Sequence, residues 1–274
     1  DRYHPDFGAD FDAYLDYLHA SVELLCTQYG EIGGLWFDGN WSRPRADWKE
    51  DRLYGLIRKH QPNAMIINNT GIHKMGQVGH PEIDSTTFEQ GRPTPMDRRG
   101  MPKYISAEMC QTMNMHWGIA TNDYNYMSPQ DIIENLCACR KVGANYLLNV
   151  GPTADGAIPD YERATLERVG KWLELHGDPI YNGKPCGVAG PGADFGLDAG
   201  GTLYLFVHHL KPGHGQQAGD VAGPGPRTFE GVDRTVASVA WLDTGEALEF
   251  ERTAGALTGP ATGLPFGATT VLRV

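Results

Sequence analysis

Residues 128–150 read SPQDIIENLCACRKVGANYLLNV, and this segment has the pattern of one complete helix followed by one strand. Ser128 can cap a helix, Pro129 suits its first position, and Asp131 follows three residues after the cap, as in a capping box. Gly143 supplies the left-handed residue that commonly ends a helix. The short apolar run from 145 to 150 then predicts a buried strand.

The same alternation continues on both sides of this segment. A helix is expected to start at Asp10, with a buried stripe formed by Phe11, Tyr14, Leu15, Leu18, Val22 and Leu25. Further strands are expected at 32–37, 64–68 and 103–107, further helices at 47–60 and 159–176, and irregular chain at 71–102. Strands that alternate with helices indicate parallel β/α units, so an open doubly wound sheet and a (β/α)8 barrel both fit.

The last third of the chain has a different sequence pattern. Helical periodicity stops near residue 184, and β-type runs at 202–208, 236–241 and 269–274 lie between turns rich in Gly and Pro. This pattern predicts a small antiparallel β domain. We therefore expect an α/β domain over residues 1–183 and a β domain over residues 184–274.

Composition excludes several classes of partner. The chain of 274 residues has a formal net charge of −11, which argues against a nucleic acid. No apolar run approaches the roughly 18 residues of a membrane helix, so no membrane is expected. No signal peptide is visible and the five cysteines are odd in number, which favours a cytoplasmic location. Cys137 and Cys139 lie on an apolar helical stretch and are expected to be buried free thiols.

Polar side chains follow the predicted strands where those strands end. In GGLWFDGNW, residues 33–41, an apolar run finishes on Asp38 between two tryptophans, and Asn68 and Asn69 end the next strand. The loops after parallel strands build active sites in such folds. Trp36 and Asp38 alternate along the strand, so both side chains can face one substrate. An Asp–Gly turn is the structural alternative, but a carboxylate beside aromatic rings suits glycosidic cleavage.

Such cleavage needs a second carboxyl group. Glu89 lies in TTFEQGRP, after Phe88 and before Arg92, and is the first candidate. Glu108, directly after the strand expected at 103–107, is the second.

No metal ion and no cofactor are expected. His73 and His80 lie seven residues apart, and His208 and His209 are adjacent, which is poor geometry for one ion. No Gly-x-Gly-x-x-Gly fingerprint opens a predicted helix, so nucleotide binding has little support.

Together these segments resemble a known family. GGLWFDGNW, NNTG, TTFEQ, MNMHWGI, the run from 128 to 159 and RVGKWLELHGDPIY are similar to the α-L-fucosidases of glycoside hydrolase family 29. The resemblance covers about residues 1–185 and is most specific from 128 to 181. It implies the C-terminal half of a (β/α)8-type barrel, that is, an incomplete barrel, followed by the antiparallel β domain.

The resemblance also implies an activity and its residues. It implies a retaining exo-glycosidase that hydrolyses terminal α-L-fucosyl linkages in glycans, so the expected partner is a fucosylated oligosaccharide or glycoconjugate. The nucleophile falls on Asp38 and the general acid/base on Glu89, with Glu108 as second choice. Trp36 and Trp117 are the expected aromatic contacts to the sugar, and Asn68 and Arg92 are further candidates for binding it. The alternatives are a catalytically impaired fucose-binding module and a glycosidase acting on a related sugar such as galactose.

The chain departs from the family pattern in two places. Thr70 stands where the family often has an arginine after the second strand. RYHPDF, residues 2–7, resembles a segment already past the family's first strands and the histidines that grip fucose. Because an incomplete barrel exposes strand edges, we expect a homo-oligomer that covers the open half.

Overall fold

The computed structural model describes residues 10–69, 74–208, 226–260 and 270–274. The chain divides into two compact units, Asp1–Cys110 and Gln111–Val274. The domain boundary expected at residues 183 and 184 stays a prediction, although the change from helix to antiparallel sheet falls there.

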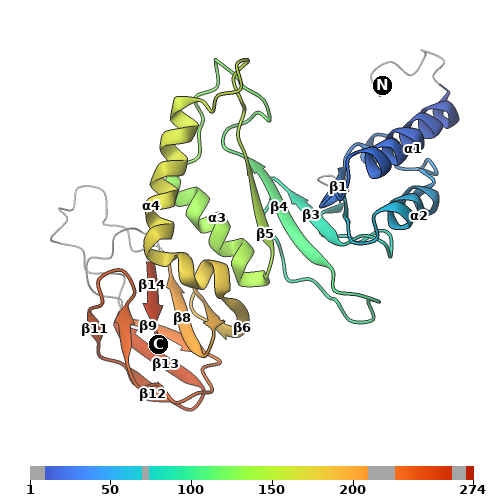
Figure 1. Ribbon diagram of the computed structural model, residues 1–274. Coiled ribbons are helices and arrows are strands. Elements are labelled where there is room, and N and C mark those ends of the chain that lie inside the picture. Colours follow the sequence, from blue (N-terminus) through green and yellow to red (C-terminus); the bar gives the residue numbers. More distant parts are fainter. Residues whose placement is uncertain (1–9, 70–73, 209–225, 261–269) are drawn as a thin grey trace. The chain divides into compact units, whose positions relative to one another are not determined.

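The first unit is built on parallel strands (Figure 1). Its elements are α1 (Phe11–Gln28), β1 (Gly34–Phe37), the 3-10 helix η1 (Asn40–Ser42), α2 (Glu50–His60), β2 (Met65–Asn68), β3 (Ser85–Glu89) and β4 (Ser106–Thr112), whose last two residues belong to the second unit. β1, β2, β3 and β4 pair in that order, and each pair is parallel. Sequential order without reversal is the pattern of a barrel sheet and differs from a doubly wound one.

α1 begins where the sequence predicts. Asp10 Oδ1 accepts hydrogen bonds from the backbone N–H groups of Asp12 and Ala13, and Gly30 has φ +75° after the helix end. The buried stripe is rotated from the predicted one, because Tyr14 and Leu25 are exposed. The residues of α1 that are buried are Leu15, His19, Val22 and Cys26.

The core of the first unit lies where α1, α2 and β2 meet. Tyr54 and Ile57 of α2 and Ile66 of β2 are fully buried there, together with Val22 and Cys26 of α1. This packing fixes the direction of β2 and hence the position of the residues that follow it.

Two expectations about the middle of the unit are wrong. β3 lies within residues 71–102, which the sequence suggested to be irregular, and it ends on Glu89. Glu108 lies inside β4 instead of directly after a strand, because β4 starts at Ser106 and not at residue 103. Three of the five residues of β3 are Ser or Thr, so no apolar run announces the strand.

In the second unit, α3 (Pro129–Val142) confirms the predicted capping box. Ser128 Oγ accepts from the backbone of Asp131, whose side chain accepts from the backbone of Ser128. Gly143 ends the helix at φ +72°. β5 (Asn145–Asn149) follows, and α4 (Asp160–Asn182) runs six residues beyond its predicted end at 176. Cys137 and Cys139 are buried free thiols, as predicted.

Among the described residues, a nine-stranded antiparallel sheet follows α4 in the second unit. Its strands are β6 (Lys184–Ala189), β7 (Phe195–Ala199), β8 (Thr202–Val207), β9 (Pro226–Glu230), β10 (Val239–Trp241), β11 (Ala247–Leu248), β12 (Glu251–Thr253), β13 (Ala256–Pro260) and β14 (Thr270–Arg273). Leu203 and Leu205 of β8 pack with Trp241 of β10 in its core. The predicted antiparallel β domain is confirmed.

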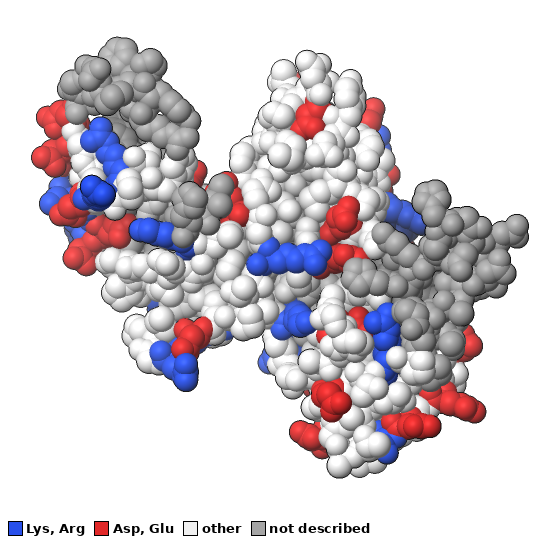
Figure 2. Space-filling view, turned by 180° about the vertical axis from the view of Figure 1, so that it is seen from behind, with Lys and Arg blue, Asp and Glu red and all other residues white. Residues whose placement is uncertain are grey.

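The surface charge and the helices can be compared with what a nucleic acid or a membrane partner would require. On the face drawn in Figure 2, Lys and Arg are interspersed with Asp and Glu and do not gather in one basic patch. Within the described ranges, no helix is both long and apolar enough to cross a membrane.

Candidate active site

The polar residues at the carboxyl ends of β1, β2 and β3 meet on one face of the parallel sheet. Phe37 pairs with Asn68, and the backbone N–H of Asn69 donates to Phe37 O at 2.7 Å, so Asp38 and Asn69 are neighbours just past their strands. Side chains alternate between the two faces of a strand. This alternation places Asp38, Asn69 and Glu89 on the same face.

Asn69 joins the two carboxylates. Its Nδ2 donates to Glu89 Oε2 at 2.6 Å and lies 3.2 Å from Asp38 Oδ1, to which it also donates. Its Oδ1 accepts from the hydroxyl of Thr87 at 2.8 Å. Ionised carboxylates only accept hydrogen bonds, so the amide nitrogen must face them, and Thr87 holds it in that orientation. The side chain is only 2% exposed, so it has little freedom to turn.

Trp41 returns to the same carboxylate from the turn after β1. Gly39 has φ +96°, a conformation that side-chain-bearing residues rarely adopt, and it lets the chain reverse into η1. Trp41 Nε1 then donates to Asp38 Oδ1 at 2.9 Å. Both donors to Asp38 therefore use Oδ1, and within the described residues Oδ2 receives no hydrogen bond.

A second polar pair lies deeper on this face. Trp36 Nε1 donates to Glu108 Oε1 at 3.0 Å. Thr87 pairs with Glu108 and Glu89 pairs with Cys110, so Glu108 lies two residues further from the strand ends than Glu89. Glu108 is buried, whereas Glu89 is partly exposed.

The carboxylates of this face affect the pKa of the Cys110 thiol. Burial is the main cause that raises the pKa of its thiol to about 12, and the negative charges of Glu89, Glu108 and Asp38 add to it. The thiol therefore stays protonated beside the carboxylates and is a poor nucleophile.

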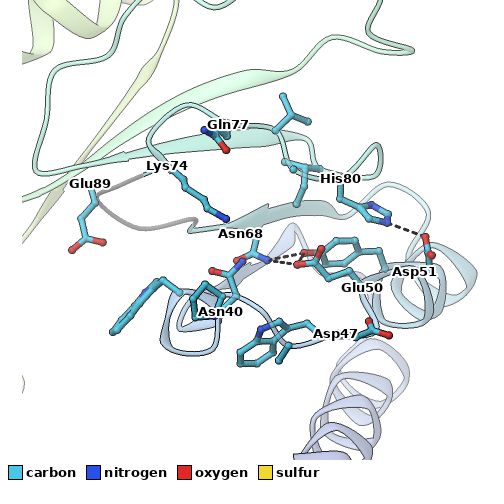
Figure 3. A pocket seen from close by; sticks show the side chains of 17 residues that line it. Asn40, Asp47, Glu50, Asp51, Asn68, Lys74, Gln77, His80 and Glu89 are labelled. Atoms are coloured by element: carbon cyan, nitrogen blue, oxygen red, sulfur yellow. Dashed lines mark hydrogen bonds and ion pairs between the residues drawn. The ribbon is translucent and has the colours of Figure 1, made fainter. Parts of the chain in front are cut away.

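Three other predicted site residues, Asn68, Arg92 and Trp117, take no part in the hydrogen bonds that join Asp38, Asn69 and Glu89. Asn68 faces the helix side, where its Nδ2 donates to Tyr54 Oη at 2.8 Å and to Glu50 Oε1 at 3.2 Å (Figure 3). Arg92 is exposed, three residues after the end of β3. Trp117 belongs to the second unit and its carbonyl accepts from Asn149 Nδ2 at 2.8 Å. Their roles in binding a sugar stay predictions.

Some expectations concern residues that the structure does not describe. Residues 2–7, Thr70, His73 and His209 lie outside the described residues. Within the described ranges, no group of three or more His, Cys, Asp or Glu side chains is arranged to hold a metal ion.

Sequence reasoning missed the roles of Asn69 and Trp41. A signal for Asn69 was present: in a pair of asparagines at a strand end, alternation sends one side chain to each face, and the second lies beside Asp38. Trp41 gave no such signal, because its contact depends on how the turn at Gly39 folds back.

Comparisons with known proteins identify relatives of the chain. The family model described as Alpha-L-fucosidase matches residues 2–178. The chain is 30% identical over 159 residues to tissue alpha-L-fucosidase of Mus musculus, which covers 56% of this chain and 33% of that protein. It is also 30% identical over 166 residues to the tissue alpha-L-fucosidase of Homo sapiens, covering 56% of this chain and 32% of that protein.

Solved structures agree on the fold. Alpha-L-fucosidase isoenzyme 1 from Paenibacillus thiaminolyticus has a TM-score of 0.78 and 30% identity, covering 100% of this chain and 64% of that chain. Alpha-fucosidase of Thermotoga maritima, at 23% identity and a TM-score of 0.67, shares the fold over 95% of this chain and 56% of its own. The expected class, an incomplete (β/α)8-type barrel followed by an antiparallel β domain, is thereby confirmed.

The chain spans about a third of the length of the curated relatives that it matches. The match of the family model extends over more than half of the chain and includes the whole carboxylate cluster. On this evidence the chain belongs to the alpha-L-fucosidase family, glycoside hydrolase family 29.

Proposed function

We propose that the protein is a retaining exo-glycosidase that removes terminal α-L-fucose from glycans, with Asp38 as nucleophile and Glu89 as general acid and base. Family membership supports the sugar, since the mouse and human relatives are named tissue alpha-L-fucosidases. The observation that carries the choice of residues is the sharing of one amide nitrogen, that of Asn69, between the two carboxylates.

The distances support retention of configuration. Asp38 Oδ1 and Glu89 Oε2 can be no further apart than the sum of 3.2 Å and 2.6 Å, their distances from Asn69 Nδ2. Retaining glycosidases hold their carboxyl groups about 5–5.5 Å apart, whereas inverting enzymes need about 6.5–9.5 Å to admit a water molecule. A shared amide donor thus keeps these two oxygens closer than the separation that an inverting enzyme needs.

In the first step Asp38 attacks the anomeric carbon. A bond forms between a carboxylate oxygen and that carbon as the bond to the glycosidic oxygen breaks, and Glu89 gives its proton to the leaving oxygen. Trp41 and Asn69 both donate to Oδ1 of Asp38, so Oδ2 is the oxygen positioned to attack. The indole and amide donors hold the carboxylate in place during this step.

In the second step Glu89 acts as a base. It takes a proton from water, the water oxygen attacks the anomeric carbon, and the ester to Asp38 breaks, which regenerates both carboxyl groups. Of the two oxygens of Glu89, Oε2 accepts from Asn69, so Oε1 is the oxygen that can carry the transferred proton.

Glu89 is preferred to Glu108 on geometry. Glu89 ends its strand and shares a donor with Asp38, whereas Glu108 is buried inside β4 and accepts from Trp36. A general acid must reach the glycosidic oxygen, which favours the carboxyl group at the strand end. We assign Glu108 the role of orienting Trp36. The proposed contacts to the sugar remain Trp36, Trp117, Asn68 and Arg92.

The test is hydrolysis of an aryl α-L-fucoside followed by NMR spectroscopy of the sugar first released. α-L-Fucose as the first product supports a retaining fucosidase, and β-L-fucose contradicts retention. Binding of fucose without any turnover would favour the impaired binding module. Faster turnover of an aryl α-galactoside would favour the related sugar.

We also propose that the protein forms a homo-oligomer. β1 pairs with β2 on one side, and no strand of the described residues pairs with its other edge. An open strand edge favours pairing with another chain, and Trp36 on the adjoining face of the sheet is exposed. Light scattering tests this proposal, and a monodisperse monomer contradicts it.

A further inference from the structure

A cavity of about 780 Å³ opens beside the carboxylate pair in the first unit (Figure 3). Its walls come from the turn after β1, the first turns of α2 and the chain that leads to β3, and Glu89 lies at one end. This volume falls within the range of about 300–1,000 Å³ that ligand pockets occupy. The catalytic assignment above uses only Glu89 and Trp41 of its lining.

The position of Glu89 tells which part of a substrate would enter the cavity. The general acid contacts the glycosidic oxygen, and the leaving group extends from the far side of that oxygen. Glu89 lines the cavity, whereas Asp38, which would contact the anomeric carbon of fucose, is not among the lining residues. The cavity therefore lies on the leaving-group side of the bond to be cleaved.

Two indoles give the cavity apolar surfaces. Trp41 and Trp48 both line it. Trp48 is fixed by an edge contact with Phe11, at 5.2 Å between ring centroids, and its Nε1 donates to Arg43 O at 3.1 Å. Rigid aromatic faces beside polar groups suit the apolar C–H faces of sugar rings.

The charges of the wall select against anions. Asp47, Glu50 and Asp51 line the side nearest α2, and Lys74 is the one Lys or Arg among the described lining residues (Figure 3). His80 is held by Asp51 at 3.0 Å. Lys49 pairs with Asp47 at 2.6 Å, so the charge of Asp47 is balanced from outside the lining. Glu50, Asp51 and Glu89 still outnumber Lys74. This excess repels a sialylated or sulfated group, whereas the hydroxyls of a neutral sugar can donate to carboxylates.

From these observations we propose that the cavity binds the sugar to which the fucose is attached, and that this sugar is part of a neutral saccharide. The proposal rests on the proposed function for the placement of fucose. It adds a specificity for the leaving group, set by Trp48 and by the acidic wall, that Asp38 and Glu89 alone do not provide.

The experiment compares two substrates that differ in the leaving group. The lactose of 2′-fucosyllactose would enter the cavity under this proposal, whereas the leaving group of α-L-fucosyl fluoride is too small to reach Trp48. Trp48→Ala should lower the ratio of kcat/KM for fucosyllactose to that for the fluoride by roughly five- to tenfold. Tyr17→Ala, which removes an exposed aromatic ring of α1 outside the cavity, should leave the ratio unchanged. An unchanged ratio in Trp48→Ala overturns the proposal.

A titration separates failure of the proposal from failure of the proposed function. Lactose should bind the wild-type protein and quench tryptophan fluorescence, 3′-sialyllactose should bind more weakly, and Trp48→Ala should bind lactose more weakly. If neither fucoside is hydrolysed, the proposed function fails and the titration alone decides about the cavity. No binding of lactose, or stronger binding of 3′-sialyllactose, overturns the proposal.

Discussion

Asn69 donates a hydrogen bond to Glu89 at 2.6 Å from the same amide nitrogen that donates to Asp38. A neutral side chain thus links the two carboxyl groups through one donor. Because Thr87 fixes the amide from its oxygen side, the spacing of the carboxylates is set by β2 and β3 and not by flexible loops.

Asn69→Asp should lower kcat on an aryl α-L-fucoside by about 10- to 100-fold and move the pH–rate profile to higher pH. The variant has nearly the same shape but adds a third carboxylate, and a like charge disfavours the ionised form of its neighbours. Activity measured from pH 4 to pH 9 checks both effects.

Asn63→Asp is the matched control, since it makes the same chemical change in the exposed turn before β2 and away from the carboxylates. It should leave the profile in place. Wild-type rate and profile in Asn69→Asp would contradict the positioning role.

Glu89→Ala should lose about 10²- to 10⁴-fold in rate on fucosides with poor leaving groups and far less on those with good ones. A good leaving group departs without a proton, so only the poor one reveals the missing acid. Rates on a series of aryl fucosides of graded phenol acidity make the measurement.

Glu108→Gln is the comparison for that series. It keeps an oxygen that can accept from Trp36 and should show no dependence on the leaving group. A leaving-group dependence in Glu108→Gln, and none in Glu89→Ala, would exchange the two assignments.

Trp41→Phe should lower kcat on α-L-fucosyl fluoride by about three- to tenfold with little change in thermal stability. The substitution removes the indole N–H that holds Asp38 Oδ1, while the ring, 41% exposed, contributes little to the core. Kinetics and a thermal melt of the same preparation check it. A large drop in stability would assign Trp41 to packing instead.

Stability should fall as the pH drops below about 6.5, the pKa of an unfolded histidine. Burial is the main cause that lowers the pKa of His176, which stacks on Trp172 in the second unit, and burial likewise lowers the pKa of His19. The unfolded chain therefore binds more protons than the folded one in this range, which favours unfolding.

His176→Leu removes one of these groups and should make the free energy of unfolding depend less on pH between about 7 and 5. Urea titrations at several pH values measure this dependence. The same slope in the variant and the wild type would exclude His176 as a cause.

Local patterns in the sequence account for much of the fold and for part of the site. Ser128 and Asp131 identify the start of α3 because a capping box satisfies backbone groups within four residues. Asp38 could be found because an apolar strand leads directly to it. β3 was missed because Thr86 and Thr87 interrupt any apolar run, and only its neighbours in the sheet make it a strand.

The hydrogen bonds of the site depend on contacts that are distant in the sequence. Asn69 and Glu89 are twenty residues apart, and their contact follows from the pairing of β2 with β3. Neither periodicity nor composition reveals how β2 and β3 align. The ranking of Glu89 before Glu108 could therefore be predicted, but the hydrogen bonds from Asn69 to both carboxyl groups could not.

The most direct test of the account replaces the proposed nucleophile. Asp38→Gly should not turn over an aryl α-L-fucoside, because no carboxylate can form the glycosyl ester. Added azide should restore cleavage by entering the vacated space, with β-L-fucosyl azide as the product. Hydrolysis at a near wild-type rate by Asp38→Gly without azide would contradict the assignment of Asp38 as the nucleophile.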